Sequence, residues 1–148
     1  MGLHTQTHQE LFLPIRPDYA DFDVPVQLSF RWADILQQLR VMPYQQVALF
    51  AFRSIQKADV DQHILHMLDE GALLAAKEAP GFIHYQSSEG LSYCLWQTHA
   101  DARAAISAPA HLQAAEYAPQ AYERYELQSW LVARTAIPGN VEFVPVEL

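Results

Sequence analysis

The spacing of hydrophobic residues changes twice between residues 90 and 134. Apolar and polar residues alternate up to Trp96, an alanine-rich stretch with a break at Pro109 follows, and a second alternating segment runs to Arg134. Alternation is typical of a strand, whereas a spacing of three and four residues is typical of a helix. Proline is favoured in a first helical turn and disfavoured in a helix interior. We therefore expect a strand, a helix in two pieces and a second strand.

The preceding segment carries signals of the same kinds. Residues 46–55 are mostly apolar, with a first charge at Arg53, as in a buried strand. Residues 59–79 have a helical spacing, and residues 82–87 and 91–97 alternate on either side of a tight turn, as in a β-hairpin. The helix has an apolar stripe that we expect to face a sheet, made of Val60, Ile64, Met67, Leu68, Gly71, Leu74 and Ala75.

From residue 46 the order of elements is strand, helix, strand, strand, helix, strand. This order predicts an α+β fold of the ferredoxin-like βαββαβ type, in which an antiparallel sheet carries two helices on one face. We expect one domain in three parts. These are an N-terminal arm and helix that pack on the domain (1–45), the ferredoxin-like unit (46–134) and a tail with a short edge strand (135–148).

The four strands of the ferredoxin-like unit carry apolar or aromatic residues on both faces. The face without the two helices is therefore expected to be shielded from water, because an apolar surface of that size is rarely left exposed. A second copy of the chain is the simplest cover. We expect a homodimer formed through the sheet faces.

Composition and charge limit the partners and the compartment. The chain has 148 residues, of which 51% are hydrophobic, and its formal net charge is −8. Its nine lysines and arginines are spread singly, so we expect neither nucleic acid nor a membrane as a partner. A single cysteine, Cys94, no apolar run of ~20 residues and no signal peptide indicate a soluble, cytoplasmic protein.

The second half of the chain resembles a known family. The resemblance spans residues 46–133 and is carried by Trp96, Ala102, a broken helix with His111 and Ala114, and then Tyr122 and Tyr125. In this order they are similar to the antibiotic-biosynthesis-monooxygenase group of the dimeric α+β barrel superfamily. The resemblance implies a homodimer whose sheets face each other as a barrel, with a pocket in each protomer between sheet and helices. The group contains oxygenases of phenolic polyketides, quinol oxygenases and haem-degrading enzymes.

The resemblance to the haem-degrading branch fails at two positions. That branch implies a histidine ligand where this sequence has Ala114, and an asparagine on the first strand, where this sequence has Phe52 and Arg53. Haem breakdown is therefore disfavoured. The five glycines are dispersed, so the sequence has no phosphate-binding loop and no cofactor is expected. His63 and His66 lie on the polar and flanking sides of their helix, and no metal site is expected there.

An oxygenase that acts without a cofactor needs a base, donors that hold the resulting anion, and an aromatic pocket. The catalytic candidates are His111, Arg53 and His84, and the substrate-binding candidates are Trp96, Tyr93, Tyr85 and Tyr125. Histidine suits a base, since its pKa is close to working pH. Each candidate also has a structural interpretation. His111 could bond to the backbone at a helix start, Trp96 could only fill the core, and Arg53 could pair with Glu123 or Glu126.

Two functions follow from these candidates. The first is an enzyme of monooxygenase type that acts on a small hydroxy-aromatic or quinol-like substrate. The second is a non-catalytic dimeric module that binds a small hydrophobic ligand. Arg53, His111 and tyrosines around one open cavity would favour the enzyme. A filled interior in which these groups pair with acids would favour the module.

Overall fold

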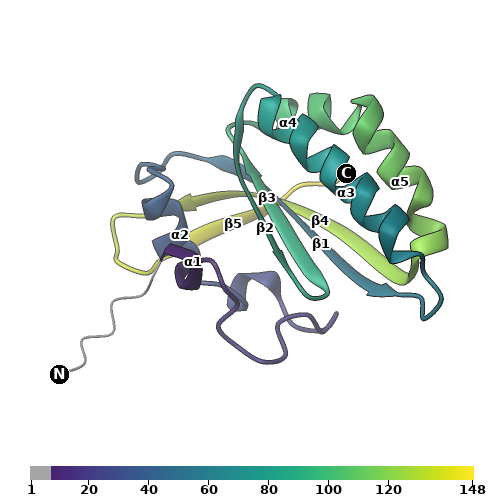
Figure 1. Cartoon of the computed structure of the whole chain (residues 1–148). Helices are drawn as coiled ribbons and strands as arrows, with labels where there is room; N and C mark the ends of the chain where they lie inside the picture. The colour runs from purple at the N-terminus through teal and green to yellow at the C-terminus, as the bar shows by residue number, and fades with distance from the viewer. Residues whose placement is uncertain (1–7) are drawn as a thin grey trace.

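The computed structural model describes residues 8–148 and contains one five-stranded antiparallel sheet, in the order β2-β3-β1-β4-β5 (Figure 1). The strands are β1 Val47–Gln56, β2 Phe82–Ser88, β3 Leu91–Trp96, β4 Tyr122–Arg134 and β5 Val141–Pro145. The first four strands have the ferredoxin-like order, and β5 extends the sheet beside the C-terminal half of β4. The α+β fold and the short edge strand predicted from the sequence are confirmed.

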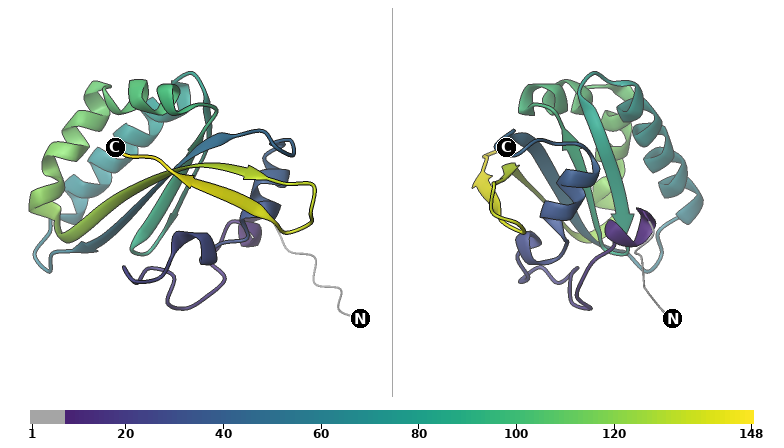
Figure 2. Two further views of the ribbon diagram at one scale, coloured as in Figure 1. Left: turned by 180° about the vertical axis from the view of Figure 1, so that it is seen from behind. Right: turned by 90° about the vertical axis from the view of Figure 1, so that its left-hand side faces the viewer.

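Helices lie on both sides of the sheet (Figure 2). One side carries α3 Gln62–Glu78, α4 His99–Ile106 and α5 Pro109–Ala121, and the other carries α1 His8–Leu11, the 3₁₀ turn η1 Val26–Leu28 and α2 Trp32–Gln38. Side-chain caps fix where two helices begin: Asp61 accepts hydrogen bonds from the first turn of α3, and the Thr98 hydroxyl accepts one from the Asp101 amide, at 3.0 Å. In the part of the chain that the structure describes, no helix is long and apolar enough to cross a membrane.

Helix α3 is rotated relative to the prediction. Leu65 is buried and Ala76 packs against the sheet, whereas Met67 and Leu74 of the predicted stripe are 58% and 57% exposed. The reason is steric. The sheet presents Phe50 and other bulky rings to this side, and small alanine side chains let the helix approach them closely. The stripe predicted to face the sheet therefore faces solvent for much of its length.

The opposite face of the sheet is covered by the chain itself. Side chains from the N-terminal segment, Phe12, Val26, Phe30, Trp32, Ile35 and Leu36, form one buried cluster with residues of β1, β3 and β4. At the centre of this face, Leu49 and Leu95 are fully buried. The argument for a second copy of the chain assumed that nothing in the chain covers this face. That assumption is wrong, because side chains between Phe12 and Val41 pack on the face assigned to a partner sheet.

Candidate functional site

The sheet separates the predicted site residues into two groups. Arg53, His84 and Tyr93 lie on the face covered by the N-terminal segment, as the strand register and ring contacts show. Trp96, Tyr85, Tyr125 and His111 lie on the side of α3–α5. Side chains on opposite faces of a sheet cannot line one cavity. The seven residues therefore do not form the single site that the sequence suggested.

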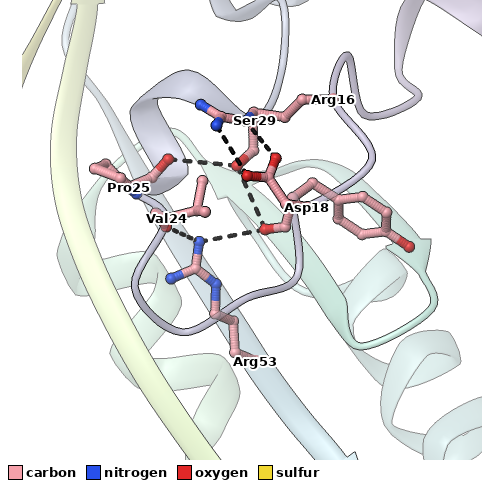
Figure 3. Close-up of polar contacts among 7 residues, drawn as sticks. Arg16, Asp18, Val24, Pro25, Ser29 and Arg53 are labelled. Atoms are coloured by element: carbon pink, nitrogen blue, oxygen red, sulfur yellow. Dashed lines mark hydrogen bonds and ion pairs between the residues drawn. The ribbon is translucent and has the colours of Figure 1, made fainter.

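Arg53 binds the N-terminal loop (Figure 3). Its side chain is on β1 and is 3% exposed, and the guanidinium donates hydrogen bonds to the carbonyl oxygens of Phe22, at 3.3 Å, Tyr19, at 3.4 Å, and Val24. Burial lowers the pKa of Arg53, while the charge of Glu126, opposite it in the register, acts the other way. The guanidinium thus fastens the loop to the sheet through backbone carbonyls.

His84 and Tyr93 are parts of an aromatic core on the same face. The His84 ring stacks on Phe12 with centroids 4.3 Å apart, and its Nε2 lies 3.1 Å from Gln86 Oε1. Tyr93 meets Trp32 edge to face at 4.8 Å, and its buried hydroxyl has no hydrogen-bond partner among the described residues. Burial lowers the pKa of His84 and raises that of Tyr93. Both residues join the N-terminal segment to the sheet.

Trp96 and Cys94 pack together on the side of α3–α5. The Trp96 indole Nε1 donates to Cys94 Sγ at 3.2 Å, and its ring meets Phe82 edge to face at 5.3 Å. Burial raises the pKa of Cys94 to about 11, so its thiol stays protonated near neutral pH. These two residues fill the core between the sheet and the helices.

Two histidines near the start of α4 and α5 have buried ring nitrogens. Neither His111 Nδ1 nor His99 Nε2 has a hydrogen bond of normal geometry with any described residue. Burial lowers the pKa of His111, an effect that the nearby backbone of Ile106 partly opposes. His99 was not singled out from the sequence; its ring lies 5.1 Å from that of Phe50, and burial lowers its pKa as well. Both imidazoles are therefore favoured in the neutral form, which can accept a proton.

Phe52, Tyr122 and Tyr125 form a group of rings where β1 ends and β4 begins. The Phe52 ring lies 5.4 Å from that of Tyr122 and 6.1 Å from that of Tyr125, and the two tyrosine rings are 5.9 Å apart. Asp69 of α3 and Tyr85 of β2 lie within electrostatic range of this group, because the charge of Asp69 raises the pKa of both Tyr85 and Tyr122, and Tyr85 also raises the pKa of Tyr122. We call Asp69, Tyr85 and Tyr122, together with Phe52 and Tyr125, the tyrosine cluster.

In the tyrosine cluster, burial raises the pKa of one carboxyl group and of two phenols. Partial burial of its carboxyl group raises the pKa of Asp69, although much of the residue's surface is exposed, and His66 opposes this effect. Burial, followed by the charge of Asp69, raises the pKa of Tyr122 to about 12. Burial also raises the pKa of Tyr85, whereas hydrogen bonds with Ser87 and Ser92 lower it. The cluster offers a carboxylate of increased basicity beside two phenols that remain donors.

Asp69 escaped the sequence analysis because the helical wheel was oriented by the larger apolar residues, which put Asp69 on the polar side. The small residues give the correct orientation. Asp69 lies four positions after the buried Leu65 and three before Ala72, so it shares their stripe of α3 although its own side chain is largely exposed. An acidic residue on the same stripe of the helix as small alanines was the signal in the sequence that could have singled out Asp69.

Two grooves lie away from the tyrosine cluster. One, of about 600 Å³, runs between the loop 22–27, the C-terminal half of β4 and the C-terminal residues, and the other, of about 570 Å³, lies between residues 13–19 and the end of β2. Arg53 lines the first, but its guanidinium is engaged by backbone carbonyls. Across residues 8–148, no three histidine, cysteine or acidic side chains come together as metal ligands.

A family model described as PB2B2.08-like matches residues 3–143 of the sequence. The chain belongs to the PB2B2.08-like family. No curated protein matches it. Among solved structures, the PB2B2.08-like chain is similar to a hydroxynitrile lyase from Passiflora edulis, at 12% identity and a TM-score of 0.51 over 63% of this chain and 99% of that one. It is also similar to SnoaB, a cofactor-independent oxygenase from Streptomyces nogalater, at 15% identity and a TM-score of 0.47 over 64% and 98%.

These likenesses concern the fold. At 12% identity the likeness to the hydroxynitrile lyase supports the α+β fold alone and carries no activity over to the PB2B2.08-like chain. The share of this chain that matches the hydroxynitrile lyase, 63%, is close in length to the ferredoxin-like unit predicted in residues 46–134.

Proposed function

We propose that the protein is an enzyme of monooxygenase type that acts on a small hydroxy-aromatic or quinol-like substrate at the tyrosine cluster. The observation that carries the proposal is the raised pKa of Asp69 beside the phenols of Tyr85 and Tyr122. A carboxylate made more basic by its surroundings and set beside fixed donors is an arrangement that removes a proton and holds the product anion.

The first step is the loss of a proton from the substrate. The substrate ring packs against Phe52 and Tyr125, and its hydroxyl group or an activated C–H group gives its proton to the Asp69 carboxylate. Asp69 is then neutral, so it no longer repels the anion that it has formed. The hydroxyls of Tyr85 and Tyr122 donate to that anion, and their raised pKa values keep them protonated as the charge develops.

The second step uses molecular oxygen as the oxidant. The electron-rich anion reduces O₂, one oxygen atom is retained by the substrate and the other leaves as water. For an activated methylene group the balance is R₂CH₂ + O₂ → R₂C=O + H₂O. Partial burial of Tyr85 and Tyr122 supports this step, because it limits the access of water to the anion that their hydroxyls hold.

His111 is a second candidate base on the same side of the sheet. Its lowered pKa favours the neutral imidazole, and its Nδ1 has no partner of normal geometry in the described part of the chain. Arg53 and His84 are not assigned a catalytic role, since they bind the N-terminal segment on the other face.

A second candidate function is the non-catalytic module that binds a small hydrophobic ligand. It is favoured by the separation of Arg53 and His111, which leaves no single cavity lined by both. The two functions differ in turnover. A module would bind a hydroxy-aromatic ligand and consume no oxygen.

Oxygen consumption with a panel of hydroxy-aromatic compounds tests the proposal, in air and under anaerobic conditions, without added metal, haem or flavin. The native protein is compared with Asp69→Asn, Tyr122→Phe and His111→Ala. Glu70→Gln is the matched control, because Glu70 is an exposed neighbour of Asp69 that pairs with His66 at 3.4 Å. We expect Asp69→Asn to lower kcat by about 10²–10⁴-fold, as for loss of a general base, and Glu70→Gln to leave it unchanged. Equal rates for Asp69→Asn and the native protein would refute the proposal.

A further inference from the structure

Two loops lie side by side at the end of the molecule away from α3 and α5 (Figure 1). One follows α2 and leads into β1, and the other joins β4 to β5. The Tyr44 amide donates to the Arg134 carbonyl at 2.8 Å, and Arg134 Nε donates to the Val41 carbonyl at 2.9 Å. The two loops are therefore fixed to each other.

These loops expose three large apolar side chains. Met42 is 63% exposed, Tyr44 is 65% exposed and Ile137 is 66% exposed. Single exposed apolar residues are common, but here three of them are carried by two loops that are hydrogen-bonded to each other at one end of the molecule. We call Met42, Tyr44 and Ile137 the apolar tip.

The apolar tip is held rigidly. The Gln45 amide donates to the Met42 carbonyl at 3.1 Å, and Gln45 Oε1 accepts from the Met42 amide at 3.0 Å. In the other loop, the Asn140 amide donates to the Ile137 carbonyl at 3.1 Å, and the Ile137 amide donates to a neighbouring threonine hydroxyl at 3.2 Å. The side chains are thus presented to solvent by ordered turns.

The backbone of the first loop is strained on both sides of Met42. Arg40 has φ 63° and Tyr44 has φ 65°, values in the left-handed region that residues with side chains seldom adopt. Such conformations persist where the surrounding structure imposes them, and they are often found at functional sites. Glycine would relieve the strain at position 44, but it would also remove the exposed ring.

The two loops that carry the apolar tip have a net positive charge, opposite in sign to that of the whole chain. Residues 40–46 and 134–141 contain two arginines, Arg40 and Arg134, and no acidic residue, whereas the whole chain has 17 acidic residues and a net charge of −8. An anionic surface is therefore attracted to this end and repelled by the rest of the molecule, which also sets the orientation of approach.

We propose that the apolar tip docks on the surface of a bilayer that contains anionic lipids. Exposed turns that carry apolar side chains suit the deformable interface of a membrane, where tyrosine rings and arginines are favoured. Arg40, which is exposed, binds lipid phosphate, and Arg134, whose Nε is bound to the Val41 carbonyl, adds its positive charge, while Met42, Tyr44 and Ile137 enter the headgroup region. With three side chains inserted the contact is weak and sensitive to salt. The proposal concerns the whole protein's location and does not rest on the activity proposed above.

Co-sedimentation with vesicles tests the proposal. Full-length protein is mixed with vesicles of phosphatidylcholine alone, or of phosphatidylcholine with phosphatidylglycerol, at low and high salt. We expect binding to the anionic vesicles, weakened by salt, and little binding to the neutral ones. Ile137→Ser is expected to lower the partition coefficient about tenfold through lost apolar contact. Arg40→Gln is expected to lower it about fivefold through lost attraction to lipid phosphate.

Met67→Ser is the matched control, because Met67 is exposed to a similar extent but belongs to α3, which Figure 1 shows away from the two loops that carry the tip. It should bind as the native protein does, and circular dichroism shows whether each variant is folded. Native protein that stays in the supernatant with both kinds of vesicle overturns the proposal. Equal binding by native protein and folded Ile137→Ser also overturns it.

Discussion

Replacing Arg53 with methionine tests the account of the N-terminal segment. The change keeps most of the apolar stem of the side chain, and it removes a guanidinium that donates to the carbonyls of Tyr19, Phe22 and Val24. Hydrogen bonds from a charged group contribute about 1.5–3 kcal/mol each, and relief of the buried charge offsets part of the sum. We expect Arg53→Met to lower the free energy of unfolding by about 3 kcal/mol.

Urea denaturation followed by tryptophan fluorescence measures this effect, since Trp32 and Trp130 are buried on the same face. Arg124→Met is the matched control. Arg124 also contacts the loop, with its guanidinium carbon 3.8 Å from the centre of the Phe22 ring, but its side chain is exposed. A cation–π contact at an exposed site contributes about 0.5–1 kcal/mol, so the control should be much less destabilised. If Arg53→Met is as stable as the native protein, the guanidinium does not hold the loop.

Three further predictions concern the packing and the pH dependence. Tyr93→Phe removes a buried hydroxyl that has no hydrogen-bond partner among residues 8–148. We expect the free energy of unfolding, measured in urea, to stay the same or to rise by up to about 1 kcal/mol. A decrease of more than about 1 kcal/mol would show that the hydroxyl is hydrogen-bonded. Leu65→Ala should lower the free energy of unfolding by about 2–4 kcal/mol and Met67→Ala by less than about 0.5 kcal/mol. A larger loss for Met67→Ala than for Leu65→Ala would support the orientation of α3 that was predicted from the sequence. The pKa values of His84, His99 and His111 are lowered from 6.5, so just below that pH the unfolded chain binds more protons than the folded one. The free energy of unfolding should therefore be highest above about pH 6.5 and fall as the pH drops through that value. A flat profile of stability between pH 7 and 5 would contradict the burial of these rings.

The strands and the cap of α4 could be predicted because their signals are local. Alternation predicted a strand at residues 91–97, close to the observed β3, and a threonine followed three residues later by an acid, as at Thr98 and Asp101, is a local signal of the helix start that the structure shows. These features depend on neighbours within a few residues, so no tertiary information was needed.

The orientation of α3 and the cover of the second sheet face could not be predicted in the same way. For α3, the orientation was predicted from the large side chains of Met67 and Leu74. The small alanine side chains pack better against the bulky rings of the sheet, and this depends on tertiary contacts. For the sheet, the first 28 residues have little periodicity, so nothing local showed that Phe12 and Val26 would be buried on it.

Part of the tyrosine cluster was among the residues singled out from the sequence. Tyr85 and Tyr125 were named as substrate-binding candidates, a role that stays a prediction, while Asp69 was placed on the polar side of its helix. Arg53 was correctly seen as an unusual charge on an apolar strand. Its partners could not be read from the sequence, because they are backbone carbonyls, which every residue has.

The most direct test of the proposed site is an NMR titration of protein with labelled tyrosine and aspartate, as a hydroxy-aromatic ligand is added. We expect the signals of Tyr85, Tyr122 and Asp69 to shift together, and the signal of Tyr93, on the other face of the sheet, to stay in place. Shifts at Tyr93 without shifts at Tyr85 and Tyr122 would place the ligand on the wrong side of the sheet and contradict the account.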